Sequence, residues 1–164
     1  MPTLQRNCWN GGSSELKRFV CRTEEETMAL GERLLLAVPV PGVIALYGDL
    51  GAGKTALVRG MGRALGIDSI TSPTFTIVHE YRTKPQLCHF DAYRLDGADA
   101  IFEIGFDEYL AKPDAVLVLE WAELVEDALP HDRLNVRLTG SGDDPREICL
   151  EPVGNAYERA VTAL

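Results

Sequence analysis

The stretch "VIALYGDLGAGKTALVRGMGRALG", residues 43–66, decides the fold of this chain. It begins with a short run of apolar residues, passes through a loop that holds three glycines, and continues into a segment that ends at Gly66. Glycines between two regular segments allow a tight backbone path that other residues resist. The stretch therefore predicts a strand, a glycine-rich loop and a helix, in that order.

The loop in this stretch, "GDLGAGKT" (residues 48–55), matches the phosphate-binding pattern GxxxxGK[ST]. Its glycines let successive N–H groups point at phosphate oxygens, and Lys54 can reach the outer phosphates. Thr55 begins the helix, so the positive end of the helix dipole faces the anion and the hydroxyl can bind Mg²⁺. The alternative is an ordinary glycine-rich turn with a surface lysine. The predicted nucleotide-binding residues are Gly48, Asp49, Leu50, Gly51, Ala52, Gly53, Lys54, Thr55, Ala56 and Trp121.

A second stretch, "VLVLEW" (residues 116–121), predicts a strand that is buried on both faces and ends in a carboxylate. In open parallel sheets, ligands bind outside the carboxyl ends of the strands. Glu120 is therefore predicted to bind Mg²⁺ together with Thr55, at the Walker B position that Asp usually occupies. A strand end paired with an arginine is the alternative for Glu120. Trp121 is expected either against the nucleotide or a partner, or in the core.

A third stretch, "CHFDAYRL" (residues 88–95), places Asp91 at the end of another predicted strand. Asp91 can position or deprotonate the attacking water, or lie behind the ligands of the magnesium. It can also simply cap the turn that follows the strand. Arg94 either stabilises charge on the transferred phosphoryl group or pairs with Asp91 or Glu103. The predicted catalytic residues are Lys54, Asp91 and Glu120.

The loop "TSPTFT" (residues 71–76) carries hydroxyl groups on both sides of Pro73. Loops of this composition can sense a γ-phosphate, as the switch segments of GTPases do. Ser72, Thr74 and Thr76 are therefore predicted to form a switch loop. An alternative is a turn, closed by Ser or Thr side chains, that starts a strand.

The remaining sequence alternates predicted strands and helices, which favours a layered α/β fold. Thr23 is predicted to cap a helix, and strands are predicted at residues 75–81 and 87–93. A hairpin across "SGDDP" (residues 141–145) and a closing helix from residue 155 follow. We predict a three-layer P-loop NTPase fold with a mainly parallel sheet flanked by helices. Residues 1–18 are expected to be a flexible N-terminal extension, and residues 19–164 a single P-loop domain.

Composition limits the classes of function. The 164 residues are 46% hydrophobic, and 25 acidic against 16 basic residues give a net charge of −9. Such a charge argues against independent binding to nucleic acid and permits docking on a basic partner. Neither a signal peptide nor a membrane-spanning run is predicted, and the four scattered cysteines indicate reduced thiols. We expect a cytoplasmic protein.

Five motifs together carry a resemblance to a known family. "GDLGAGKT", "SPTFTIV" with Tyr81, "HFDAYRL", "EIGFDEYL" and "LEW" occur in the order and spacing of the bacterial TsaE (YjeE) family, over residues 22–138. The chain departs from that pattern at Ala92, where the family often has Leu, and at Ala122, where it often has Pro. The resemblance implies a P-loop ATPase that acts in making threonylcarbamoyladenosine in tRNA. It also implies that Thr55 and Glu120 bind magnesium, that Asp91 is needed for hydrolysis, and that Trp121 lies near the nucleotide.

The same resemblance implies the cofactors and partners. ATP and Mg²⁺ are the expected cofactors, and TsaD and TsaB type proteins the expected partners, with tRNA reached only through that complex. No membrane association is expected, and the isolated protein is expected to be a monomer. A small-molecule kinase is the main rival, although no arginine-rich lid is evident, and a nucleotide-dependent scaffold is another. A GTPase is disfavoured because the sequence has no NKxD motif.

Overall fold

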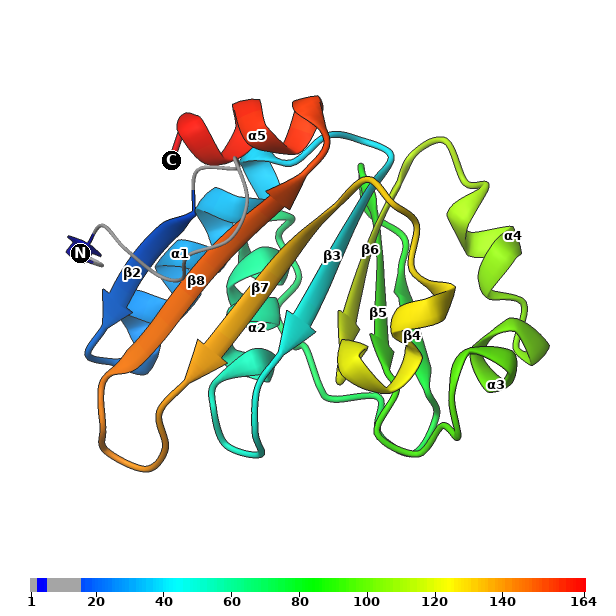
Figure 1. The fold of residues 1–164 in the computed structure, drawn as a ribbon, viewed down its shortest axis with the longest axis horizontal. Helices are drawn as coiled ribbons and strands as arrows, with labels where there is room; N and C mark the ends of the chain where they lie inside the picture. The colour runs from blue at the N-terminus through cyan, green and yellow to red at the C-terminus, as the bar shows by residue number, and fades with distance from the viewer. Residues whose placement is uncertain (1–2, 6–15) are drawn as a thin grey trace.

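The sheet is organised around β3 (Gly42–Tyr47), which lies between β6 (Ala115–Glu120) and β7 (Arg133–Thr139). Both neighbours run parallel to β3, and β5 (Gln86–Asp91) extends the parallel part beyond β6. Every residue of β3 and β6 is buried, which explains their unbroken apolar sequences. The computed structural model describes residues 3–5 and 16–164, and Figure 1 shows the fold.

Antiparallel strands complete both edges of the sheet, whose order through the described residues is β1-β2-β8-β7-β3-β6-β5-β4. The connections between β4 and β5 and between β7 and β8 are too short for the crossover that parallel strands need, so these pairs are antiparallel. The predicted parallel pairing is therefore confined to the four central strands. The strands outside the parallel part are β1 (Thr3–Gln5), β2 (Lys17–Cys21), β4 (Val78–Tyr81) and β8 (Arg146–Val153), of which β1 and β4 lie at the two edges.

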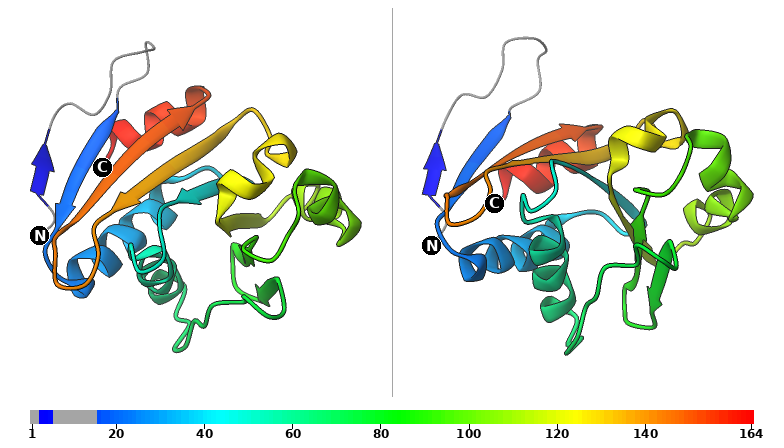
Figure 2. Two further views of the ribbon diagram at one scale, coloured as in Figure 1. Left: turned by 60° about the horizontal axis from the view of Figure 1, so that its bottom comes forward. Right: turned by 90° about the horizontal axis from the view of Figure 1, so that it is seen from below.

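Helices cover both faces of the sheet, as the three-layer prediction requires (Figure 2). One face packs against α1 (Glu24–Ala37), α2 (Lys54–Ala64) and α5 (Asn155–Thr162), and this layer contains the larger hydrophobic core. The smaller core, over β5 and β6, packs against α3 (Ala98–Glu103), α4 (Phe106–Leu110) and the 3₁₀ segment η1 (Ala122–Ala128). Within the described ranges, no helix is both long and apolar enough to cross a membrane.

The topology brings the ends of five strands to one end of the sheet, the lower end in Figure 1. The four parallel strands all end there, because they point in one direction. β2 points the same way, since two antiparallel pairings separate it from β7. The loop after β3, the turn from β2 into α1 and the turn from β7 into β8 therefore meet at this end of the sheet. Residues far apart in the sequence are thus placed around one region.

Two sequence predictions need correction. The strand expected at residues 75–81 begins only at Val78, because the Pro73 carbonyl accepts hydrogen bonds from the N–H groups of Thr76 and Ile77 and closes a turn. Ile77 also has a φ of 71°, which is incompatible with extended backbone. The domain boundary expected at residue 19 falls inside β2, and Thr3–Gln5 pairs with that strand. The rest of the predicted extension, residues 1–2 and 6–15, lies outside the described residues.

Helices α1 and α2 pack closely because glycines lie at their contact. A methyl group on Gly60 of α2 would overlap the backbone carbonyl of Met28 in α1, and one on Gly31 of α1 would overlap the carbonyl of Leu57 in α2. Backbone atoms cannot rotate away as side chains do. The position of α2, and hence of the loop before it, therefore depends on these two residues having no side chain.

We predict that Gly60→Ala lowers the free energy of unfolding by about 3 kcal/mol, the upper end of the usual cost of overpacking. Chemical denaturation measures this change. Gly62→Ala on the same helix is the matched control. Its new methyl group would meet the Ile70 side chain at 2.6 Å, instead of a backbone carbonyl at 1.9 Å as at Gly60, so the cost should be smaller. Equal stability of Gly60→Ala and the unsubstituted protein would contradict the packing described here.

Candidate functional site

The glycine-rich loop ends at the start of α2, as the sequence predicts. Gly53 has a φ of 101°, in the left-handed region that favours glycine, and it precedes the first helical residue, Lys54. No side chain caps this helix end, so its first N–H groups have no side-chain acceptor. An uncapped helix start next to a lysine is a site for an anion.

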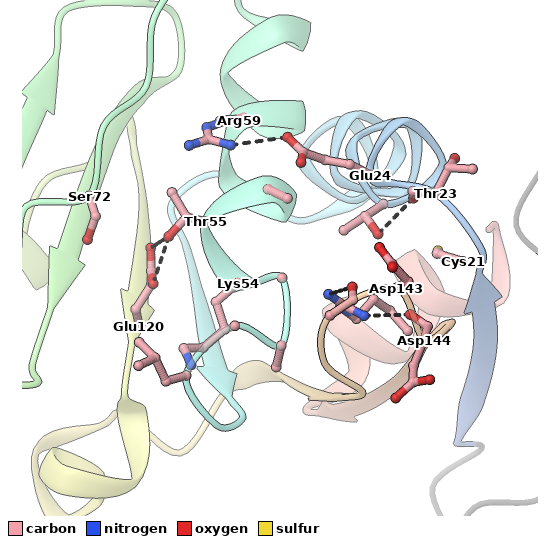
Figure 3. A pocket seen from close by; sticks show the side chains of 18 of the residues that line it. Cys21, Thr23, Glu24, Lys54, Thr55, Arg59, Ser72, Glu120, Asp143 and Asp144 are labelled. Atoms are coloured by element: carbon pink, nitrogen blue, oxygen red, sulfur yellow. Dashed lines mark hydrogen bonds and ion pairs between the residues drawn. The ribbon is translucent and has the colours of Figure 1, made fainter.

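A cavity of about 690 Å³ lies over this helix start (Figure 3). Its wall includes Leu50 to Ala56 of the loop and helix, which covers the predicted nucleotide-binding residues except Gly48 and Asp49. Gly48 and Asp49 instead provide carbonyl oxygens that accept hydrogen bonds from the Lys54 ammonium. The wall also includes Ser72, Thr74, Asp91, Glu120 and Trp121, which come from other segments of the chain.

Glu120 faces Thr55 across one side of the cavity, as Figure 3 shows. The Thr55 hydroxyl lies 3.1 Å from Oε1 and 3.2 Å from Oε2 of the carboxylate. Nε2 of His89 lies 2.7 Å from Oε1 of the same group, and both side chains are buried. The partners of Glu120 are therefore a threonine and a histidine, and not the arginine that the alternative predicted. Two neighbouring oxygen groups, one of them charged, form a set that suits Mg²⁺.

Lys54 lies within reach of this carboxylate and of an aromatic ring. Burial lowers the pKa of the Lys54 ammonium, and the negative charge of Glu120 acts in the opposite direction. Nζ lies 3.9 Å from the centre of the Trp121 ring, a cation–π distance. Trp121 is only half-buried and lines the cavity, so it belongs to the site rather than to the interior of the core. An anionic ligand would compensate for the water that the ammonium has lost.

Asp91 organises the loop at residues 71–77. Its Oδ2 accepts hydrogen bonds from the hydroxyls of Ser72 at 3.0 Å and Thr74 at 2.8 Å. Its Oδ1 accepts one from the N–H of Tyr93 at 2.9 Å. Asp91 therefore caps the turn after β5, as one alternative predicts, and at the same time ties the predicted switch loop to the strand that lies beside Glu120.

Two residues of this region lie elsewhere than expected. Thr76 does not join Ser72 and Thr74 at Asp91, because the turn at Pro73 leaves its side chain exposed. The guanidinium of Arg94 lies 5.2 Å from the centre of the Phe75 ring rather than against Asp91 or Glu103. Phe75 is itself 85% exposed. The tip of the loop therefore presents an aromatic ring to solvent.

Sequence reasoning missed His89 and the far wall of the cavity. His89 precedes Asp91 by two residues, and the period of two along a strand was the signal that both side chains share a face. The far wall had no local signal, because it is made by two separate turns. Arg146 lies there beside Gly53, and its guanidinium donates hydrogen bonds to the carbonyls of Gly142 and Asp144. The remaining residues of this wall are Cys21, Arg22, Thr23, Glu24, Thr27, Arg59 and Asp143.

Sequence comparison gives an independent result. A family profile described as "Threonylcarbamoyl adenosine biosynthesis protein TsaE" matches residues 21–148. A tRNA threonylcarbamoyladenosine biosynthesis protein TsaE from Bacillus subtilis is 45% identical over 148 residues, which is 87% of this chain and 91% of that protein. The protein of the same name from Streptomyces coelicolor is 39% identical over 140 residues, which is 82% of this chain and 93% of its own length.

Structural comparison agrees. The crystal structure of YdiB from Bacillus subtilis superposes with a TM-score of 0.77 and is 38% identical in sequence. The match covers 93% of this chain and 96% of that protein.

We predict that Asp91→Ala loosens the loop at residues 71–77. Loss of a charged acceptor removes hydrogen bonds each worth roughly 1.5–3 kcal/mol. Amide hydrogen exchange of Thr76 and Ile77, whose N–H groups close the turn at Pro73, should therefore become about tenfold faster or more. Asp96→Ala is the control. It removes an exposed carboxylate from the connection between β5 and α3, and it should leave the exchange of Thr76 and Ile77 unchanged. Unchanged exchange in Asp91→Ala would show that the loop is held by other contacts.

Proposed function

The chain belongs to the TsaE family of tRNA threonylcarbamoyladenosine biosynthesis proteins, and from that premise we propose that it is a Mg²⁺-dependent ATPase of this modification. It binds ATP in the cavity, hydrolyses it to ADP and phosphate, and acts on a complex of TsaB and TsaD type proteins. One observation carries the proposal. A single cavity joins the uncapped start of α2 and Lys54 to the carboxylates that end β5 and β6.

The phosphates of ATP would lie at the start of α2. The N–H groups of the loop and the first helical turn supply donors without a side-chain cap. Lys54, held here by two backbone carbonyls, would exchange these neutral acceptors for a charged phosphate oxygen. A phosphate oxygen carries negative charge, so the ammonium would gain a Coulomb attraction that a neutral carbonyl does not provide. The exchange therefore favours nucleotide binding.

Thr55 and Glu120 would hold the magnesium. Their oxygen atoms are the hard donors that this ion prefers, and they lie side by side at the edge of the phosphate region. Among the described residues, no group of three or more His, Cys, Asp or Glu side chains is placed to hold a metal by itself. This suits Mg²⁺, which usually takes one or two protein ligands and completes its shell with phosphate oxygens and water. The ion, when bound, would neutralise phosphate charge.

Asp91 would orient the water that attacks the γ-phosphate. It lies next to Glu120 in the parallel register of β5 and β6, so the two carboxylates share one end of the cavity. Its hydrogen bonds to Ser72 and Thr74 make the loop part of the same arrangement. A change in the loop would thus change the position of Asp91. The rest of the cavity, toward Thr23 and Arg146, would accommodate the nucleoside.

The exposed residues around the cavity suit a protein partner. Phe75 and Leu50 are 85% and 84% exposed, and both lie on loops at the rim of the site. Apolar side chains exposed next to a nucleotide site can be covered by another protein. The net charge of −9 disfavours direct contact with tRNA and favours a basic docking surface. A partner bound there would contact the loop that Asp91 holds.

We predict that Lys54→Ala raises the dissociation constant for ATP at least about tenfold, because hydrogen bonds to charged groups are worth roughly 1.5–3 kcal/mol. Isothermal titration calorimetry measures this constant. Lys112→Ala removes a lysine that lies against Tyr109, outside the cavity, and is the matched control. Wild-type affinity in Lys54→Ala would refute the assignment of the phosphate site. Phosphoryl transfer to a metabolite, instead of release of phosphate, would favour the rival function of a small-molecule kinase.

Glu120→Gln and Asp91→Asn should affect different steps. Loss of the Glu120 charge should weaken ATP binding about tenfold in the presence of Mg²⁺ and leave binding in EDTA unchanged. Asp91→Asn should spare affinity and lower turnover about 100-fold, the usual contribution of a group that acts on the attacking water. Calorimetry with and without the metal, together with phosphate release, separates the two effects. Equal losses of affinity in both variants would contradict this division of roles.

We further predict that TsaB and TsaD together raise the rate of ATP turnover at least about tenfold, a change of about 1.4 kcal/mol in the barrier. Phosphoryl transfer depends on positioning and charge stabilisation, so a site that a partner completes would turn over slowly by itself. Steady-state phosphate release is measured with each partner alone and with both. The stimulation should weaken as salt is raised, since acidic docking on a basic surface is screened. Full turnover by the isolated chain would rule out activation by the partners.

A further inference from the structure

His89 is a buried histidine that hydrogen-bonds to Glu120 and has no role in the steps described so far. It lies in β5, two residues before Asp91, and its side chain is fully buried on the face of the sheet that packs against α2. Its Nε2 lies 2.7 Å from Oε1 of Glu120. Its Nδ1 is buried and has no hydrogen-bond partner in the described part of the chain. A buried polar atom left without a partner needs an explanation.

The contact with Glu120 defines which nitrogen carries a proton. A carboxylate accepts hydrogen bonds, so Nε2 must donate. A proton on Nδ1 would be a buried donor without an acceptor, which costs more than a lone pair left alone. His89 is therefore present as the tautomer with its proton on Nε2. The ring can serve Glu120 in this form without any other partner.

The position of Glu120 depends on contacts from two different elements. Thr55 of α2 reaches both carboxylate oxygens, and His89 of β5 reaches Oε1 from within the sheet. If Thr55 turns its hydroxyl toward a metal, the contact from His89 is the one that remains rigid, because the imidazole is enclosed by the core. Partners of this kind fix the orientation of a ligating carboxylate, and their loss typically costs 10- to 100-fold in metal affinity.

We propose that His89 is a positioning residue, which holds the Glu120 carboxylate in the orientation that Mg²⁺-dependent ATP binding requires. The proposal rests on the proposed function, since it gives Glu120 its role at the metal. It differs from a purely structural role for His89, in which loss of the ring would disturb folding or nucleotide binding in general. The two are separated by the dependence of binding on the metal.

The test compares His89→Leu, which keeps the buried volume without the donor, with His89→Gln, whose side-chain amide can donate at the place of Nε2. His89→Leu should raise the Mg²⁺ concentration for half-maximal ATP binding about tenfold or more. Binding of ATP in EDTA should stay as in the unsubstituted protein, and His89→Gln should restore the Mg²⁺ dependence to within about threefold. His131→Leu, at a histidine whose side chain is 86% exposed, is the control. Calorimetry and circular dichroism are the measurements.

A second readout needs no nucleotide. In ¹⁵N NMR spectra of the free protein, the His89 ring should show the proton on Nε2, and Glu120→Gln should shift its resonances. A proton on Nδ1, or wild-type Mg²⁺ dependence in His89→Leu, would overturn the proposal for His89. So would an equal loss of ATP affinity with and without metal. Failure of the unsubstituted protein to bind ATP with Mg²⁺ at all would instead overturn the proposed function, while the NMR result could still stand.

Discussion

The parallel pairing of β6 with β3 on one side and β5 on the other is the constraint on which the rest of the structure depends. Strands that run in parallel end at the same edge, so Glu120 and Asp91 become direct neighbours, and the loop after β3 opens next to them. Such pairing requires crossover connections, and these place α2 on one face and α3 and α4 on the other. The cavity is a consequence of this arrangement rather than of any single motif.

The site contains three charged side chains that are buried at the end of the sheet. Lys54, Asp91 and Glu120 are each at most 5% exposed, although charged groups are rarely buried unless they are paired. Thr55 and His89 satisfy the carboxylate of Glu120, while two carbonyls and an aromatic ring surround the Lys54 ammonium. These partners are neutral or weakly polar. The arrangement is therefore poised to gain free energy from a bound polyanion and its cation, which would pair the charges more strongly.

The loop at residues 71–77 links the site to the surface. Ser72 and Thr74 donate hydrogen bonds to the buried carboxylate of Asp91, while Phe75, the residue after Thr74, projects to solvent. A contact at Phe75 would thus act on a segment that is only a few residues long and is anchored at the buried carboxylate of Asp91. Leu50, in the glycine-rich loop before α2, offers a second exposed apolar group at the same cavity. If the proposed function holds, these two loops would couple partner binding to nucleotide chemistry.

The sequence by itself determined the local elements and the chemical character of the site. The apolar run predicted the strand at residues 116–120, and periodicity predicted the helix capped by Thr23. The glycine pattern predicted a helix from Thr55, one residue after the observed start of α2 at Lys54. These features depend on contacts between residues a few positions apart, which a linear reading can detect. Five motifs in order also identified the family that the comparisons show. The start of the strand at residues 75–81 was predicted three residues too early, because a backbone carbonyl, that of Pro73, and not a side-chain pattern closes the turn before it.

Only the tertiary structure decided which residues meet. The contact between His89 and Glu120 spans 31 positions, and the wall formed by Thr23 and Arg146 joins two turns more than 100 residues apart in the printed sequence. The limit of the parallel pairing to four strands likewise follows from which strands become neighbours. A side chain's type fixes what it can bind, but its partner is set by strand order and register, and these arise from the packing of the whole core.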